Sequence, residues 1–382
     1  MTPKKKRPST LVVEGGRRKE WRGRLVNVPV ERASTVLFDD VESLDASRAG
    51  LGSYHYGLQG TATHWALSDA LSKLDEGAAG TSLYSSGLAA MTSALLSLLS
   101  AGDELLVTDS VYGPTRTFCD KILKRFGVTT RYYDPLDVDA LAAVIGRETR
   151  AILLESPGSL TMEVQDVPSI CAMARERGIA TILDNTWATP LFFPAIAAGV
   201  DISIIAATKY IAGHADVMVG AASANREYFP HLQRTSWDLG QTLSPDDAWL
   251  ASRGIRTLAV RLKQHEASAL KVAHWLKRQP KVGLVLHPAL ADCPGHEFWK
   301  RDFKGSTGLF SFELDGDPCG FVDNLQMFGI GFSWGGYESL ALPARPQRTV
   351  SKAPASNLVR LHVGLEDPDD LIEDLSSVLS KI

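Results

Sequence analysis

One lysine and one aspartate in the middle of this chain each follow an apolar run. Lys209 comes after the run IIAAT and before a polar turn, and Asp184 comes after TIL. A lysine amine condenses with aldehydes, and a buried carboxylate keeps a pyridine nitrogen protonated. Together the two side chains suggest pyridoxal phosphate (PLP). For an isolated pair, a solvated strand-end lysine and a capping aspartate are the commoner explanation, so other positions must agree.

A turn earlier in the chain suits a phosphate group. Residues 85–88, Ser-Ser-Gly-Leu, open an apolar stretch at 88–102 that is typical of a buried helix. Free backbone N–H groups and the positive end of a helix dipole favour an anion at such a turn. An ordinary helix cap has the same residues. The sequence contains neither G-x-G-x-x-G after a strand nor G-x-x-x-x-G-K-[ST], so a phosphate bound here need not belong to a nucleotide.

The elements that must position these residues alternate along the middle of the chain. β-Branched runs predict strands at 81–86, 104–110, 128–134, 151–156, 181–185 and 201–208, with helices near 88–102, 116–126 and 170–177. This alternation predicts a parallel sheet covered on both faces. Ligands bind beyond the carboxyl ends of the strands in such sheets. Five polar positions lie at these ends: Ser86, Tyr112, Glu155, Asp184 and Lys209.

Near the C-terminus, the segment LVRLHVGL has the alternation of a strand with two different faces. Val359, Leu361 and Val363 share one face, and Arg360 and His362 share the other. An arginine on an inner face is costly unless an anion meets it. A structural salt bridge and a bound substrate carboxylate explain this arginine about equally well. The acidic residues that follow, in GLEDPDDL, indicate the start of a helix.

Length and composition limit the class of protein. The 382 residues exceed the roughly 250–300 that a single core holds, so we expect one large and one smaller domain. A net charge of −4 gives no general attraction to nucleic acid or anionic membranes. The longest apolar stretch, 88–102, is too short and too rich in Ser and Thr to span a membrane. We therefore expect no nucleic acid and no membrane among the partners.

The cysteines, the histidines and the basic start of the chain receive no catalytic role. The four cysteines lack pairwise ligand spacing, which argues against a disulfide scaffold and suits a reducing, cytoplasmic compartment. The histidines match no zinc motif, so no metal is expected. The basic residues 4–7 precede no apolar signal-peptide region and are interpreted as a solvated, mobile tail.

Many separated blocks of the sequence resemble the PLP-dependent enzymes of cysteine and methionine metabolism, which include the trans-sulfuration enzymes. From Tyr56 to the C-terminus the blocks are YGLQGTATHWAL, SSGLAAM, SVYGPT, ESPGSLTMEVQDVP, LDNTWATP, AATKYIAGHAD, GHEFWKRDFKGSTGLFSFEL, FSWGGYESL and RLHVGLED. Within this family, PGSLTMEV, TWATP, GHEFWKRDF and SWGGYESL are most similar to bacterial cystathionine β-lyases.

The resemblance implies a fold and a division into domains. The fold is α/β, the fold type I of PLP-dependent transferases, like aspartate aminotransferase. It has a large, mostly parallel sheet domain and a smaller C-terminal α/β domain. We expect an N-terminal arm at residues 1–55 that makes contacts between subunits, a PLP-binding domain at 56–245 and the small domain at 246–382.

The resemblance also implies roles for the matching residues. Lys209 would carry the cofactor and then move protons between Cα and the leaving sulfur, with Tyr112 and Tyr56 completing the catalytic group. Asp184 would pair with the pyridine nitrogen, and Tyr112 would stack on the ring. The groups expected to hold the phosphate are the N–H groups of Gly87 and Leu88, the Thr208 hydroxyl and Tyr56 of the neighbouring subunit. Those expected to bind the substrate are Arg360, Ser333, Trp334 and Tyr112.

Three positions depart from the pattern of many relatives. Many relatives have an arginine two residues after the tyrosine that matches Tyr56, and this chain has Leu58 there. One positive contact to the phosphate or the substrate is therefore missing, and either Gln59 replaces it or no residue does. Ala206 replaces a serine three residues before the lysine, and Gly158-Ser159 replaces an expected asparagine. The last two departures also occur in the β-lyase branch, so Leu58 bears most on affinity and substrate choice.

The implied reaction is α,β-elimination of L-cystathionine to homocysteine, pyruvate and ammonia, in methionine biosynthesis, by a homotetramer built as a dimer of dimers. A γ-lyase or γ-synthase of the same family would use the same cofactor residues. Side activity on cystine, as a cysteine desulfhydrase, or on alanine, as a racemase, is a further alternative. From another class, a cofactor-free binding or scaffold protein is supported by Leu58 alone.

Overall fold

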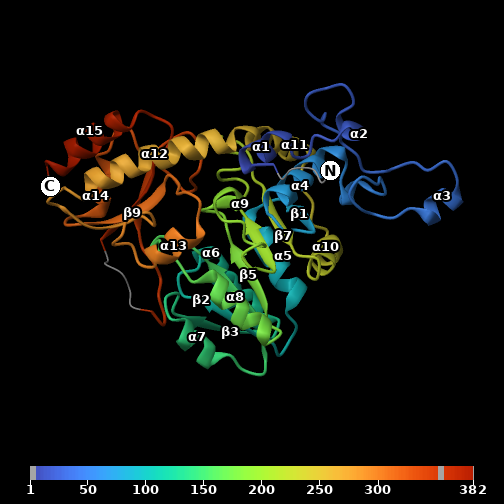
Figure 1. Ribbon diagram of the computed structural model, residues 1–382, viewed down its shortest axis with the longest axis horizontal. Helices are drawn as coiled ribbons and strands as arrows, with labels where there is room; N and C mark the ends of the chain where they lie inside the picture. Colours follow the sequence, from blue (N-terminus) through green and yellow to red (C-terminus); the bar gives the residue numbers. More distant parts are fainter. Residues whose placement is uncertain (1–5, 352–356, 382) are drawn as a thin grey trace.

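Two separate β-sheets, each flanked by helices, dominate the molecule (Figure 1). The computed structural model describes residues 6–351 and 357–381. The larger sheet has seven strands in the order β1-β7-β6-β5-β4-β2-β3. These strands are β1 (Gly80–Tyr84), β2 (Glu104–Thr108), β3 (Thr129–Tyr133), β4 (Thr149–Glu155), β5 (Ala180–Asp184), β6 (Ile202–Ile205) and β7 (Gly220–Ala224).

The large sheet is mostly parallel, as expected, and one of its strands runs antiparallel to its neighbours. Strands β6, β5, β4, β2 and β3 run parallel, whereas β7 lies antiparallel between β1 and β6. All six strands predicted from β-branched runs are present, and β7 was missed. Its sequence, GAASA, is fully buried and consists of small residues without a β-branched pattern.

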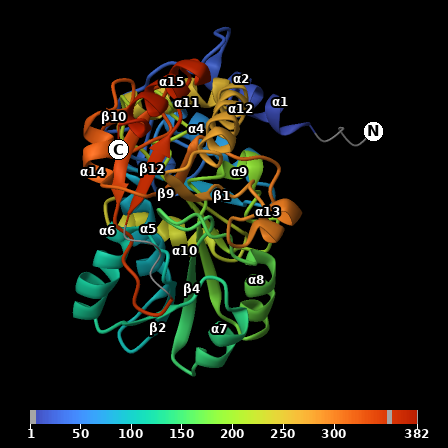
Figure 2. The same ribbon diagram turned by 90° about the vertical axis from the view of Figure 1, so that its left-hand side faces the viewer.

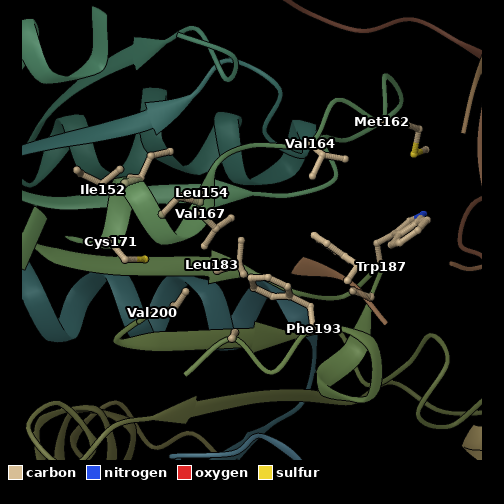
Figure 3. Close-up of a cluster of buried hydrophobic side chains, with 14 of the residues drawn as sticks. Ile152, Leu154, Met162, Val164, Val167, Cys171, Leu183, Trp187, Phe193 and Val200 are labelled. Carbon is tan, nitrogen blue, oxygen red and sulfur yellow. The ribbon is translucent and has the colours of Figure 1, made fainter. Parts of the chain in front are cut away.

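Helices cover both faces of the large sheet, and alternate residues of the strands pack against them. The helices that precede, connect or follow these strands are α4 (Ala62–Leu74), α5 (Gly87–Leu98), α6 (Gly113–Thr117), the π-helical η2 (Phe118–Leu123), α7 (Val138–Val144), α8 (Val167–Glu176), α9 (Thr189–Phe192) and α10 (Phe229–Asp238). Leu153 and Ile182 pack in a core with Met91 of α5, on one face. Ile152 and Leu183 pack with Val167 of α8 on the other (Figure 3). Strands that are buried on both faces explain the continuous apolar runs of the sequence.

The smaller sheet has five strands in the order β10-β11-β12-β9-β8. Its strands are β8 (Val282–Leu286), β9 (Leu309–Leu314), β10 (Gly329–Ile330), β11 (Leu340–Ala344) and β12 (Leu358–His362). The accompanying helices are α12 (Leu258–Leu276), α13 (His296–Asp302), α14 (Pro318–Asp323) and α15 (Pro368–Leu379). As predicted, α15 begins after GLED, and the carboxylate of Asp367 caps it by accepting from the Asp369 N–H at 2.9 Å.

Along the chain, α11 (Pro245–Gly254) and the short 3-10 turn η3 (Ile255–Thr257) come after the last strand of the large sheet and before the first strand of the small one. Ala248 and Ala251 of α11 share a buried cluster with Leu67 and Leu71 of α4, which belongs to the large domain. The domain limits remain a proposal, and this packing favours a boundary after α11 rather than at residue 245. Figure 2 shows β9, β12 and α15 at one end of the large sheet, with β2 and α7 towards the other end.

The N-terminal arm begins with α1 (Pro8–Glu14) and continues through α2 (Lys19–Arg22) and α3 (Val41–Ala46) to the turn η1 (Gly57–Gln59). Lys4 and Lys5 lie outside the described residues. Lys6 and Arg7 are exposed, as expected for a solvated segment, and Lys6 pairs with Glu14 of α1, whereas Val12 is buried against α4. Figure 1 shows α3 reaching away from the rest of the molecule. Among the described residues, no helix has the length and apolar character that crossing a membrane requires.

Candidate active site

Lys209 lies beyond the carboxyl edge of the large sheet, where the small domain meets it. The expectation that it ends a strand is wrong in detail: β6 ends at Ile205, and the lysine lies in the turn that follows. The turn is held by a hydrogen bond from the Lys209 N–H to the Ala206 carbonyl at 3.0 Å. The amine Nζ donates to Ser333 Oγ of the small domain at 2.6 Å. The lysine therefore faces the junction of the two domains.

The surroundings of Lys209 favour its neutral amine. Burial and the positive charge of Arg360 lower the pKa of Lys209 to about 8, although the Asp184 carboxylate acts in the opposite direction. No carboxylate lies within ion-pair distance of this amine among the described residues. A neutral amine is the form that attacks an aldehyde or accepts a proton from carbon.

Asp184 ends β5 and is held by Thr186, two residues later. Its Oδ1 accepts from the Thr186 N–H at 3.0 Å and from the hydroxyl at 2.5 Å. The same hydroxyl accepts from the Ala206 N–H at 2.9 Å, which ties β5 to the turn that carries Lys209. Burial raises the pKa of Asp184, against the hydrogen bonds from Thr186. A carboxylate in this setting gains from a cationic partner, which a protonated pyridine would be.

The first turn of α5 forms a cradle that is open at the backbone. Ser86 caps the helix by accepting from the Ala89 N–H at 3.1 Å, whereas the N–H groups of Gly87 and Leu88 have no acceptor among the described residues. A Cβ on Gly87 would lie 2.5 Å from the Cβ of Ala206. This close approach explains why position 87 is a glycine. A helix N-terminus with two free N–H groups is a phosphate site.

Thr208, which was expected to offer its hydroxyl to the phosphate, is bonded to the backbone of Val219. The hydroxyl donates to the Val219 carbonyl at 3.2 Å and accepts from its N–H at 2.8 Å. These bonds fix the turn before Lys209 against the residue that precedes β7. The hydroxyl would have to turn away from this carbonyl to donate to a phosphate.

Arg360 of β12 is a half-buried cation without a carboxylate partner among the described residues. Its Nη2 donates to the Ser333 carbonyl at 3.1 Å, and Nε is buried with no hydrogen-bond partner among the described residues. Burial lowers the pKa of Arg360 to about 10. The structural salt bridge that the sequence left open is absent from the described residues. An unsatisfied guanidinium beside Lys209 is a site for the carboxylate of a ligand.

The loop of Ser333 and Trp334 joins the lysine to the arginine. Ser333 has a backbone φ of +82°, which residues other than glycine rarely adopt. Its hydroxyl contacts Lys209 and its carbonyl contacts Arg360. Trp334 packs on Tyr210 with ring centroids 5.3 Å apart, and the Lys209 Nζ lies 5.5 Å from its ring centre. His362 Nε2 accepts from the Gly335 N–H at 3.1 Å. The strand that carries the arginine thus also fixes this loop.

Tyr112 is held at the site by a glutamate from the neighbouring strand. Its N–H donates to Glu155 Oε2 at 2.7 Å, and its side chain is 47% exposed. Burial and the carboxylates of Glu155 and Asp184 raise the pKa of Tyr112, so its hydroxyl stays protonated at neutral pH. Like Lys209, this tyrosine lies four residues beyond the end of its strand. An aromatic face with this exposure is available for stacking.

Tyr56, in contrast, makes no contact with the other site residues within this one chain. It precedes η1, is 48% exposed, and its hydroxyl has no hydrogen-bond partner in the described part of the chain. Gln59, considered as a substitute for the arginine absent at Leu58, has its Oε1 buried without a partner. In the described part of the chain, no hydrogen bond joins either residue to Lys209.

Sequence reasoning missed Thr186 and gave Glu155 and His362 no role. The signal for Thr186 is the short spacing in LDNT, because a threonine two residues after an aspartate can bond its carboxylate. All four cysteines are free, three of them buried. No cluster of metal-ligating side chains occurs among the residues that the structure describes.

A mostly parallel sheet with a lysine beyond its carboxyl edge, a helix N-terminus and a carboxylate nearby defines the PLP-dependent enzymes of fold type I. The chain belongs to the Cys/Met metabolism PLP-dependent enzymes, whose family model matches residues 9–380. PLP is therefore its cofactor. The cradle at Gly87, the lysine with a lowered pKa and the carboxylate of Asp184 all fit this group.

Relatives of known name agree with this family. The chain is 43% identical to cystathionine beta-lyase of Escherichia coli, over 99% of each chain. It is 42% identical to cystathionine beta-lyase of Haemophilus influenzae, over 98% of each chain. Its fold matches the crystal structure of cystathionine gamma-lyase from Lactobacillus plantarum with a TM-score of 0.90 and 30% identity, over 99% of each chain.

Proposed function

We propose that this chain is a cystathionine β-lyase, which cleaves L-cystathionine and water into homocysteine, pyruvate and ammonia in methionine biosynthesis. The observation that carries the proposal is the half-buried Arg360, whose Nε is buried without a partner among the described residues and which shares Ser333 with Lys209. An amino acid bound by its α-carboxylate at this arginine would lie beside the Lys209 amine, whose lowered pKa of about 8 increases its neutral fraction. The names of the relatives support the β-lyase branch over the γ-lyase branch.

In this proposal the substrate is held by groups from both domains. Arg360 binds the α-carboxylate through its guanidinium, and the loop of Ser333 and Trp334 supplies further contacts. The Lys209 amine removes the proton from Cα and returns a proton to the sulfur that leaves Cβ. Its pKa of about 8 leaves a useful neutral fraction at physiological pH.

When bound, PLP supplies an aldehyde for attachment and a ring that withdraws electrons from the substrate. Asp184 would pair with its pyridine nitrogen and keep that nitrogen protonated. The N–H groups of Gly87 and Leu88 would bind the phosphate, with the Thr208 hydroxyl as a further donor. Tyr112 would stack on the ring, and its protonated hydroxyl would remain able to donate to the substrate.

We also propose a homotetramer, built from dimers that share their active sites, in the cytoplasm. Tyr56 is exposed and has no role within its own chain, as expected for a residue that serves the partner's phosphate site. The arm carries further exposed apolar side chains, among them Leu37 (89% exposed) and Val41 (70%). A second copy would cover these groups. The four free cysteines suit a reducing compartment.

Release of a thiol from L-cystathionine tests this function. Cystathionine is a thioether without a free thiol, so a thiol can form only if a carbon–sulfur bond breaks. We expect the PLP-loaded protein to release thiol at a steady rate, and the Arg360→Ala variant to require a much higher substrate concentration. A yellow protein that releases no thiol, or a colourless one, would support the scaffold or transferase alternatives instead.

A further inference from the structure

A buried carboxylate outside the groups assigned above joins the two domains beside Tyr112. Asp109 directly follows β2 and is 0% exposed. Its two oxygens accept from the backbone N–H groups of Thr349, Val350 and Ser351 at 2.8–3.0 Å. They also accept from the hydroxyls of Thr349 at 2.8 Å and Ser351 at 3.0 Å. One side chain of the large domain thus binds three successive residues of the small domain.

Two arginines complete the cluster. Arg116 donates to Asp109 Oδ1 and to its backbone carbonyl, both at 2.8 Å, and its guanidinium lies 3.8 Å from the ring centre of Tyr132. Arg348 donates to the Asp109 carbonyl and to Glu163. The arginine side chains are 6% and 4% exposed. Buried charges at this density are tolerable because each of the two cations has a carboxylate partner, Asp109 for Arg116 and Glu163 for Arg348.

The carboxylate stays charged in this setting. Burial alone would raise the pKa of Asp109, but the bonds from Val350, Arg116, Ser351 and Thr349 together hold it below the ordinary value. An anion that accepts several N–H groups binds a loop more tightly than a neutral amide can, because an amide offers only one oxygen.

Residues 345–348, which lead directly into the anchored segment 349–351, form one wall of a cavity next to the candidate active site. The cavity has a volume of about 680 Å³ and is lined by residues 345–348 together with Arg116 and Ser159. Leu88 of the phosphate cradle also lines it, as do Val111 and Gly113, the neighbours of Tyr112. The position of residues 345–351 therefore sets the width of the space beside this tyrosine.

We propose that Asp109 is a positioning residue for substrate binding: it anchors residues 348–351 of the small domain to the segment that carries Tyr112 and so fixes the wall of the cavity. This inference rests on the proposed lyase function. Asp109 touches neither Lys209 nor Arg360, so its loss should weaken substrate binding more than it slows proton transfer.

The test uses Asp109→Asn in the PLP-loaded enzyme, with Asp120→Asn as the matched control. Asp120 is an exposed carboxylate on η2 that bonds the Tyr132 hydroxyl and does not contact residues 348–351. Hydrogen exchange of the amides of residues 349–351 should become at least about tenfold faster in Asp109→Asn, because three N–H groups lose part of their acceptor. The KM for L-cystathionine should rise about tenfold while kcat changes less than about threefold. Both values should stay unchanged in the control.

A second variant keeps the test decisive if Asp109→Asn does not fold. The double substitution Thr349→Val with Ser351→Ala removes two hydroxyl donors and leaves Asp109 in place. We expect the same direction of change, about threefold in KM. Unchanged exchange at residues 349–351, or a fall in kcat without a rise in KM, would overturn the positioning role. The parent enzyme's thiol release tests the lyase function separately, so the two failures are distinguishable.

Discussion

At Lys209, burial and the charge of Arg360 act in the same direction on one amine. Both lower its pKa, and the hydrogen bond to Ser333 Oγ holds it between the two domains. Arg360 in turn has no carboxylate partner in the described residues, so its guanidinium is available to a carboxylate beside the Lys209 amine. The chemistry of these residues thus suits a ligand that carries a carboxylate.

Replacing this lysine should remove catalysis and leave the fold intact. We expect Lys209→Ala to lower kcat by about a thousandfold or more, because the group that moves protons is lost. The melting temperature should change little, since the amine makes a single hydrogen bond at the edge of the core. The exposed Lys263→Ala of α12 is the control and should retain parent activity. Normal turnover in Lys209→Ala would show that another group is the base.

The lowered pKa predicts how the cofactor-free protein takes up PLP. Only the neutral amine attacks an aldehyde, so the attachment rate should rise with pH, reach half of its maximum near pH 8 and level off above it. An ordinary lysine would still gain rate up to pH 10. In Arg360→Ala the midpoint should move to higher pH, because a positive neighbour is removed. Stopped-flow absorbance measures both curves, and a parent rate that still climbs at pH 10 contradicts the shift.

At the scale of elements, the site depends on close contacts between strands and turns. Gly220 opens β7 directly against the cap of α5: a Cβ there would lie 1.9 Å from the Ser86 carbonyl oxygen. The position of the phosphate cradle therefore depends on close packing of the start of β7 against Ser86. Thr186 links the end of β5 to the turn of Lys209 in the same way.

A methyl group at this contact should displace the cradle. We expect Gly220→Ala to destabilise the fold by about 1–3 kcal/mol and to weaken PLP binding, because the start of α5 must move. Gly50→Ala is the control, since a Cβ at Gly50 meets nothing within 4 Å. Melting temperature and a PLP titration measure the two effects. Unchanged PLP affinity in Gly220→Ala would mean that α5 does not hold the phosphate.

Sequence patterns predicted the six strands with β-branched runs, and they predicted Lys209 and Asp184 at one edge of the sheet. These patterns did not predict β7, because its sequence GAASA consists of small buried residues, and its first residue lies at a contact too close for a side chain. They also failed at Asp109, whose partners lie some 240 residues further along the chain. Contacts of that kind depend on the tertiary fold and leave no local periodicity. The role of Tyr56 depends on a second copy, so it stays a prediction.

At the scale of the whole molecule, the N-terminal arm is the part whose apolar side chains remain uncovered in a single chain. It reaches away from both sheets (Figure 1) and exposes apolar side chains on and before α3. Such groups are usually covered by a partner. The proposed assembly would bring Tyr56 of one copy to the phosphate cradle of another.

Charges on the arm should therefore break the assembly. We expect Leu37→Asp combined with Val41→Asp to reduce the solution mass from four chains to one or two, and to lower activity because Tyr56 is misplaced. Leu136→Asp, an exposed position between β3 and α7, is the control. Light scattering coupled to gel filtration gives the mass. A double variant that keeps the parent mass would place the interface elsewhere.

The identity of the 2-oxo acid tests the central claim most directly, because it reports which carbon–sulfur bond breaks. The purified protein is incubated with PLP and L-cystathionine, and the products are identified by mass spectrometry. We predict pyruvate with homocysteine, the products of cleavage at Cβ. If 2-oxobutyrate with cysteine appeared instead, cleavage would occur at Cγ, and the β-lyase assignment would be contradicted while the fold and cofactor remained.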